Sequence, residues 1–221
     1  MKKIPLHPET MAKRVAQELA DGSFVNLGFG LPTSACNYVP EGRTVIFQTE
    51  NGILGCGPLA PEGREDLYLV NAGGQFVTLL PYASICDQAE AFAMIRGGHI
   101  DISVLGALEV SEEGDLANWF VPERRVGRIG GAMDLVSGVK KVIAIMYHTT
   151  RDGRAKIVKK CSYPLTGKKV VDTIVTDLAF FKITEAGLLL KEIAPGFTVE
   201  EIQSLTEPQF KVSEDLKEME V

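Results

Sequence analysis

The sequence predicts an α/β protein with an open, mostly parallel sheet, helices on both faces of that sheet, and an antiparallel extension at the C-terminal end. In the first two-thirds of the chain, short apolar runs alternate with segments whose apolar residues recur at helical spacing, the pattern of a parallel sheet covered by helices. Beyond His148, alternating and β-branched runs dominate, which is typical of antiparallel strands. No linker rich in Ser or Pro divides the 221 residues, so we expect residues 1–221 to form a single domain.

The chain begins with a predicted helix and strand. Apolar residues recur at helical spacing from Pro8 to Ala20, and Asp21-Gly22 ends this helix. The run from Phe24 to Gly28 predicts the first strand, followed by a Gly-Phe-Gly turn and a short helix that starts at Pro32. Further apolar strands are predicted at 44–47, 67–70, 100–105 and 142–146.

Two later helices carry capping signals. Ser84 is expected to cap a helix that runs to about Arg96, because Asp87 stands at the third position after it. Thr198 and Glu201 form a capping box at the start of a last helix. Strands of the C-terminal part are expected within 155–161, 170–184 and 188–193, with a hairpin turn at 185–187.

The composition excludes several classes of protein. Lys and Arg number 23 against 29 Asp and Glu, giving a net charge of −6 with both signs interspersed, so we expect no nucleic-acid partner. No apolar run is long enough to span a bilayer, and the amphipathic start of the chain does not resemble a signal peptide, so we expect no membrane association. The four cysteines form no C-x-x-C pair, and the three histidines lie at no metal-ligand spacing from them. We therefore expect no metal site, and four reduced thiols in a cytoplasmic protein.

Four glycine-containing turns fall where a ligand is expected. Ligands of open α/β sheets bind beyond the carboxyl ends of the strands, and turns without side chains let backbone N–H groups approach them closely. The turns are Gly28-Phe29-Gly30, Glu50-Asn51-Gly52, Asn71-Ala72-Gly73-Gly74 and Gly130-Gly131-Ala132. Thr33 breaks the dinucleotide pattern G-x-G-x-x-G, and the chain contains neither G-x-x-x-x-G-K-[ST] nor G-x-S-x-G.

Glu50 is the ionisable residue that stands out in these turns. It follows an otherwise apolar strand, and Gly52 frees the backbone next to it. Asn-Gly between two strands is also a common hairpin signal, and a solvated Glu before it needs no function. The residues alone leave both interpretations open. Asn118-Trp119 is expected to serve packing, and Asp134 is expected to cap a helix.

Four motifs together resemble those of family I CoA-transferases, and specifically the β (B) subunit of the two-subunit 3-oxoacid enzymes typified by the acetoacetate and succinyl-CoA transferases. They are Asn26–Pro32 (NLGFGLP), Gln48–Gly52 (QTENG), Asn71–Gly74 (NAGG) and Gly130–Asp134 (GGAMD). They occur in the family's order between residues 26 and 134. One position departs from the family pattern G-x-G-G-A-M-D: Arg128 replaces the first Gly, and its side chain could reach a substrate carboxylate.

The resemblance implies a fold, a site and a mechanism. The fold would be of the NagB/RpiA/CoA-transferase type. Glu50 would be the nucleophile that attacks an acyl-CoA thioester and then carries CoA as a glutamyl thioester. The residues implied in oxyanion stabilisation and CoA binding are Gly130, Gly131, Ala132, Asn51, Gly73 and Gly74; those implied in the substrate pocket are Gly28, Gly30 and Arg128.

The resemblance also implies partners. The chain would pair with a separate α subunit in an α2β2 assembly and would transfer CoA between an acyl-CoA and a carboxylic acid, in the metabolism of ketone bodies or short-chain fatty acids. Coenzyme A would be a substrate, with no metal and no tightly bound cofactor. Two alternatives are an acyl-CoA thioesterase on the same scaffold, which would lose the thioester without an acid acceptor, and a non-catalytic ligand-sensing domain. The intact E-N-G motif argues against the latter.

Overall fold

The computed structural model describes residues 3, 5–124, 126, 127 and 129–220. Its main sheet consists of β1 (Phe24–Leu27), β2 (Ile46–Thr49), β3 (Ile53–Leu59), β4 (Val77–Ile85), β5 (Ile102–Gly106), β10 (Lys141–Ile145), β12 (Thr173–Val175), β13 (Ala179–Thr184), β14 (Gly187–Ile193) and β15 (Lys211–Glu218). Two small sheets contain β6 (Glu109–Ser111), β7 (Leu116–Ala117), β8 (Phe120–Val121), β9 (Val126–Gly127) and β11 (Ile157–Val158). The helices are α1 (Pro8–Gln17), α2 (Gln88–Arg96), α3 (Ala132–Gly138) and α4 (Val199–Ser204), with 3₁₀ helices η1 (Leu31–Tyr38) and η2 (Pro122–Arg124).

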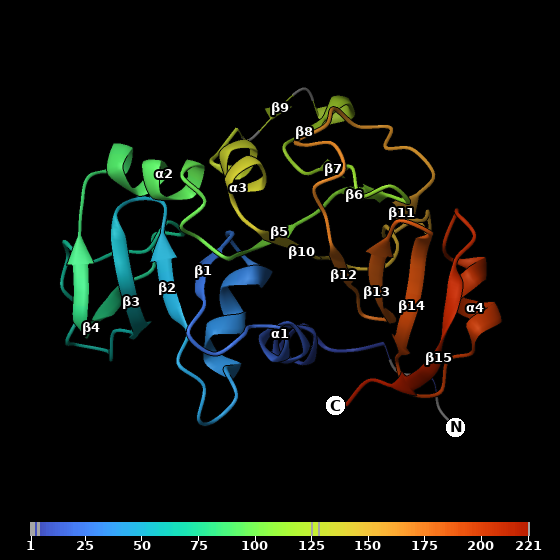
Figure 1. The fold of residues 1–221 in the computed structure, drawn as a ribbon, viewed down its shortest axis with the longest axis horizontal. Coiled ribbons are helices and arrows are strands. Elements are labelled where there is room, and N and C mark those ends of the chain that lie inside the picture. The colour runs from blue at the N-terminus through green and yellow to red at the C-terminus, as the bar shows by residue number, and fades with distance from the viewer. Residues whose placement is uncertain (1–2, 4, 125, 128, 221) are drawn as a thin grey trace.

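The main sheet runs in the order β15-β14-β13-β12-β10-β5-β1-β2-β3-β4 (Figure 1). Its central strands, from β2 through β1, β5 and β10 to β12, are parallel to one another. The pairs β12–β13 and β13–β14 are antiparallel, so the predicted mostly parallel sheet with an antiparallel C-terminal extension is confirmed. A second antiparallel meander, β2–β3–β4, forms the opposite edge of the sheet, and neither β3 nor β4 was predicted as a strand from the sequence.

Helices cover both faces of the sheet because successive strand residues point to opposite sides. On β10, Ile143 and Ile145 face a core that includes Met11, Val15 and Leu19 of the N-terminal segment. Val142 and Ala144 face the other core, which includes side chains from α2 and α3. Figure 1 shows α1 on one side of the sheet, and α2 and α3 side by side on the other. Among the described helices, none is both long and apolar enough to traverse a bilayer.

Of the two helix caps predicted from the sequence, one is confirmed and one is wrong. The capping box of Thr198 and Glu201 is confirmed at the start of α4. The expected cap at Ser84 is wrong, because Ser84 lies in β4, where it pairs with Leu54 of β3. The helix begins later, and Asp87 caps it by accepting a hydrogen bond from the backbone N–H of Glu90 at 2.8 Å.

The strand predicted at 67–70 is also wrong. These residues lead into a turn, and only Val70 pairs, through an isolated bridge to Phe76. The apolar run is therefore part of an excursion between β3 and β4 rather than a strand of the sheet.

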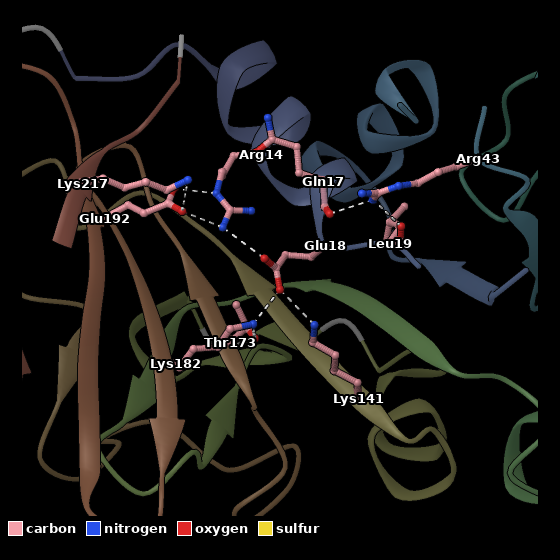
Figure 2. A network of polar contacts seen from close by, with 10 residues as sticks. All are labelled: Arg14, Gln17, Glu18, Leu19, Arg43, Lys141, Thr173, Lys182, Glu192 and Lys217. Carbon is pink, nitrogen blue, oxygen red and sulfur yellow. Dashed lines mark hydrogen bonds and ion pairs between the residues drawn. The ribbon is translucent and has the colours of Figure 1, made fainter. Parts of the chain in front are cut away.

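A network of charged side chains joins the first helix to the C-terminal strands (Figure 2). Arg14 of α1 binds Glu192 of β14 through two hydrogen bonds of 2.7 and 3.0 Å. Glu18, directly after α1, accepts hydrogen bonds from Lys141 of β10 at 3.1 Å and Lys182 of β13 at 2.6 Å. Sequence reasoning did not find this network, which fixes α1 across strands that lie more than a hundred residues away in the chain.

Candidate active site

Glu50 lies in the turn that connects β2 to β3. The two strands are antiparallel, so Asn51-Gly52, a common hairpin signal, does lie in a hairpin. Glu50 stands at the carboxyl end of β2, which is a strand of the parallel part of the sheet. This is the edge of an open α/β sheet at which ligands bind.

Gly52 fixes this turn to the chain entering α2. Its φ is +118°, and a Cβ on it would overlap the carbonyl oxygen of Cys86. The backbone N–H of Cys86 donates a hydrogen bond of 2.9 Å to the carbonyl oxygen of Gly52. A side chain at position 52 would disrupt this close approach, which gives the glycine of the E-N-G motif a structural reason.

Gln48 holds the strand directly before Glu50. Its side chain is buried, and its Oε1 accepts a hydrogen bond of 2.6 Å from Asn26 of β1. Its Nε2 donates to the carbonyl oxygen of Ala91 in α2 at 3.2 Å. The amide of Gln48 is therefore paired on both sides, and the end of β2 is fixed to the neighbouring strand and to the overlying helix.

The carboxylate of Glu50 lies against the backbone of Gly131. A Cβ on Gly131 would overlap Oε2 of Glu50 and would lie 2.8 Å from Cζ of Phe92. Gly131 has ordinary φ and ψ values of −72° and −1°, so space rather than backbone conformation requires a glycine here. Burial raises the pKa of the Glu50 carboxyl, and the nearby negative charge of Asp134 raises it further.

Glu50 forms part of the wall of a cavity of about 410 Å³. The other lining residues are Leu27, Gly28, Phe29, Ala72, Leu105, Gly106, Ala107, Leu108, Asn118, Ile129, Gly130, Gly131, Ala132 and Leu135. Glu50 is the one charged side chain among these described lining residues. The cavity thus combines a single carboxylate with mostly apolar walls and several exposed backbone segments.

The structure brings some of the predicted site residues together around this cavity. Gly28 and the three residues Gly130-Gly131-Ala132 line it together with Glu50. Arg128, the position that departs from the family motif, lies outside the described residues.

The other predicted residues lie around it. Gly30 and Gly73 line a smaller neighbouring cavity of about 110 Å³, which shares Leu27 and Ala72 with the first. Asn51 does not line the larger cavity, and it donates a hydrogen bond of 2.8 Å to the carbonyl oxygen of Val70. Gly74 lines neither cavity and has a φ of +75° in its turn.

Phe29 lines the larger cavity and contacts Gly73 of the smaller one. Its ring lies 3.1 Å from where a Cβ of Gly73 would stand. The turn that carries Gly73 is shaped by Asn71, whose Oδ1 accepts hydrogen bonds from the N–H groups of Gly73 at 2.9 Å and Gln75 at 3.0 Å. The Asn71–Gly74 turn thus contacts Phe29, which forms part of the cavity wall.

The chain is similar to one known protein family along most of its length. The family pattern described as "Coenzyme A transferase" matches residues 8–205. This chain belongs to the coenzyme A transferase family. It is similar to the B subunit of the succinyl-CoA:3-ketoacid coenzyme A transferase of Helicobacter pylori (strain ATCC 700392 / 26695), with 48% identity over 204 residues that cover 92% of this chain and 98% of that protein.

A second relative agrees with this membership of the coenzyme A transferase family, and a solved structure shares the fold. The beta subunit of the acetate CoA-transferase of Escherichia coli (strain K12) is 50% identical over 208 residues, which cover 94% of this chain and 95% of that protein. The crystal structure of an acyl-CoA transferase from Escherichia coli O157:H7 has a TM-score of 0.76 and 20% identity, covering 100% of this chain and 44% of that chain. The resemblance of the four motifs to those of the B subunit in 3-oxoacid enzymes is thereby confirmed.

Two residues of this family member have roles that sequence reasoning missed. Asn118, expected to serve packing, lines the cavity; its Nδ2 donates to the carbonyl oxygen of Gly106 at 3.1 Å, and its Oδ1 accepts from Thr166 at 2.6 Å. The expectation that Asp134 caps α3 is wrong, because Gly131 is the N-cap and makes no side-chain capping bond. Asp134 instead accepts a hydrogen bond of 2.7 Å from Nε of Arg96. Neither contact has a signal in the local sequence.

Proposed function

We propose that this chain is the β (B) subunit of an enzyme that transfers CoA between an acyl-CoA and a carboxylic acid, with a 3-oxoacid or short-chain acid as substrate. The observation that carries the proposal is the carboxylate of Glu50, which is half-buried in a largely apolar cavity and lies against the backbone of Gly131. The relatives named as subunits of CoA-transferases support it.

The proposed reaction begins when a carboxylate oxygen of Glu50 attacks the carbonyl carbon of the acyl-CoA thioester. The C–S bond breaks, CoA leaves as a thiolate, and the acyl group remains on Glu50 as a mixed anhydride. The thiolate then attacks the glutamyl carbonyl carbon, which releases the first acid and leaves CoA on Glu50 as a thioester. A second carboxylic acid takes the CoA by the same two steps in reverse, so no atom or electron is gained or lost overall.

A carboxylate is a weak nucleophile, so the rate must come from positioning and electrostatics. The backbone N–H groups of Gly131 and Ala132 are the candidates for stabilising the oxyanion that forms next to Glu50. The apolar walls of the cavity keep water away from an anhydride and a thioester, both of which hydrolyse readily. Burial raises the pKa of Glu50, which makes its carboxylate a stronger base than a solvated one.

The proposed function also includes a partner subunit, the role of CoA and a cellular compartment. The chain acts as one domain together with a separate α subunit, in an α2β2 assembly, and CoA is a substrate rather than a bound cofactor. We assign the enzyme to the cytoplasm. Asn51, Gly73, Gly74, Gly28, Gly30 and Arg128 remain the proposed contacts to CoA and substrate.

Peptide mass spectrometry tests the covalent intermediate. The complex of this chain with its α subunit is incubated with acetoacetyl-CoA without an acceptor acid, and we expect a CoA thioester on Glu50. An adduct on another residue, or no adduct under conditions of turnover, contradicts the assignment. Loss of the thioester at equal rates with and without an acceptor acid supports the thioesterase instead, and binding without any chemistry supports a sensing domain.

A further inference from the structure

Helix α2 contacts the turn that contains Glu50 and also Gly131, the residue against which the Glu50 carboxylate lies. At its start, the chain is fixed to the Glu50 turn through the close approach of Cys86 and Gly52. One turn into the helix, the carbonyl oxygen of Ala91 accepts the hydrogen bond from Gln48, two residues before Glu50. Helix α2 is therefore joined to the nucleophile's own strand and turn.

The end of α2 is joined to α3. Nε of Arg96, the last residue of α2, donates a hydrogen bond of 2.7 Å to Oδ1 of Asp134 in the first turn of α3. At the other end of α3, a Cβ on Gly138 would overlap the carbonyl oxygen of Ile95, so the two helices approach closely there. The ion pair and this close approach both hold α3 against α2.

Helix α3 in turn carries Gly131, the residue against the Glu50 carboxylate. Gly131 is the N-cap of α3, and its carbonyl oxygen accepts a hydrogen bond of 2.9 Å from the N–H of Leu135. Phe92 of α2 also packs on this glycine, at 2.8 Å from where its Cβ would stand. The chain of contacts is closed: it runs from Glu50 through α2, Arg96, Asp134 and α3 to Gly131, and back to Glu50.

We propose that Arg96 and Asp134 form a positioning pair for the transfer reaction, which holds the backbone of Gly131 at the distance from Glu50 that the reaction requires. This inference rests on the proposed function of Glu50. Neither residue lines the cavity, so the pair acts through Gly131 and not on the substrate.

Stability gives little reason for this ion pair. The side chains of Arg96 and Asp134 are 59% and 36% exposed, and ion pairs of such exposure contribute little to folding. Arg154 and Asp152 form a second pair of this kind, with 66% and 63% exposure and a distance of 2.8 Å, outside the cavity wall. This second pair is a matched control, because it allows the same Arg→Gln change in a pair that joins neither α2 nor α3.

The pair also sets the charge beside the nucleophile. The negative charge of Asp134 adds to burial in raising the pKa of Glu50. Arg96 on α2 forms an ion pair with Asp134, and we expect its positive charge to offset part of this effect. Apart from Glu50, no charged side chain lines the described part of the cavity wall. Loss of Arg96 should therefore raise the pKa of Glu50, and loss of the Asp134 charge should lower it.

The test measures the rate at which the CoA adduct forms on Glu50 in the αβ complex, by rapid quenching over a range of acetoacetyl-CoA concentrations. For Arg96→Gln we expect the rate at saturation to fall about tenfold or more, because small displacements of reacting groups are costly. We expect the concentration that gives half of this rate to stay within about threefold, because the pair does not touch the ligand. Arg96→Lys should recover part of the rate, and Arg154→Gln should match the unsubstituted complex.

The pH profile of adduct formation adds a readout that a purely structural role would not move. Because attack requires the ionised form of Glu50, the acid limb should shift to higher pH in Arg96→Gln and to lower pH in Asp134→Asn. An Arg96→Gln rate within twofold of the unsubstituted complex, an equal loss in Arg154→Gln, or failure of both Arg96 variants to assemble as folded complexes overturns the proposal. If the unsubstituted complex itself forms no adduct on Glu50, the proposed function fails, and this inference fails with it.

Discussion

Replacing Glu50 by Asp tests whether Glu50 is a nucleophile or only a solvated residue of a turn. The substitution keeps the carboxylate and withdraws it by one C–C bond, about 1.5 Å. The backbone cannot follow to compensate, because Gly52 is fixed to Cys86 and Gln48 is hydrogen bonded on both sides. The carboxylate of Glu50→Asp would therefore lose its contact with Gly131.

The size of the effect follows from this displacement. A reacting oxygen must lie within about 3–3.5 Å of the carbonyl carbon, and a misplacement of about 1 Å can cost on the order of 10²-fold in rate. A 10²-fold loss corresponds to about 2.7 kcal/mol in the activation free energy. Glu50→Ala should abolish adduct formation altogether, because no other charged side chain lines the described part of the cavity wall.

Turnover of the purified αβ complex and adduct formation at position 50 are the measurements, with circular dichroism as the control for folding. Neither variant should be less stable at neutral pH. Burial and Asp134 raise the pKa of Glu50, so its ionised form is disfavoured in the folded state. A Glu50→Asp complex that turns over within about threefold of the unsubstituted complex would refute the nucleophile assignment.

Four further outcomes are expected. Burial alone would raise the pKa of Glu18, but Lys182 and Lys141 lower it through hydrogen bonds and positive charge, and the net result is a fall from 4.5 to about 2. The stability that the ionised Glu18 gives is complete above about pH 4.5 and is lost as the pH falls toward 2. Glu18→Gln should therefore remove up to about 3 kcal/mol of the dependence of the free energy of unfolding on pH in that window, measured by urea titrations. Gly52→Ala should lower the free energy of unfolding by roughly 1–3 kcal/mol, because φ is +118° and the Cβ meets Cys86, and an unchanged denaturation midpoint would contradict this. Initial rates at varied donor and acceptor should give parallel lines, since the first acid leaves before the second enters, whereas intersecting lines would indicate a ternary complex. This chain alone should be inactive and should regain activity on mixing with its α subunit; full activity of the isolated chain would show that the site needs no partner.

The features that could be predicted from the sequence depend on residues close together in the chain. The two residues of the capping box, Thr198 and Glu201, are three positions apart, and the hairpin between β13 and β14 depends on its own turn. The alternation of apolar strands and helical segments was likewise enough to predict the class of fold, because a strand that is buried on both faces is a continuous apolar run in its own sequence. Glu50 was also accessible from the sequence, as the acidic residue of a glycine turn at the end of a strand.

Features that depend on contacts between distant segments came only from the tertiary structure. Ser84 has the chemistry of a helix cap, yet pairing with Leu54 keeps it in β4, and nothing near position 84 encodes that register. Asp134 has the chemistry of a cap too, but it binds Arg96, 38 positions away.

The candidate site also has features that follow from local sequence and features that depend on distant contacts. The sequence by itself determined which turns contain glycine and which of them contains a carboxylate. Only the tertiary structure decided that Gly131 meets Glu50 while Gly73 lies by a neighbouring cavity. The physical reason is that turn chemistry follows from local backbone preference, whereas the distance between two turns is set by how helices α2 and α3 pack on the sheet.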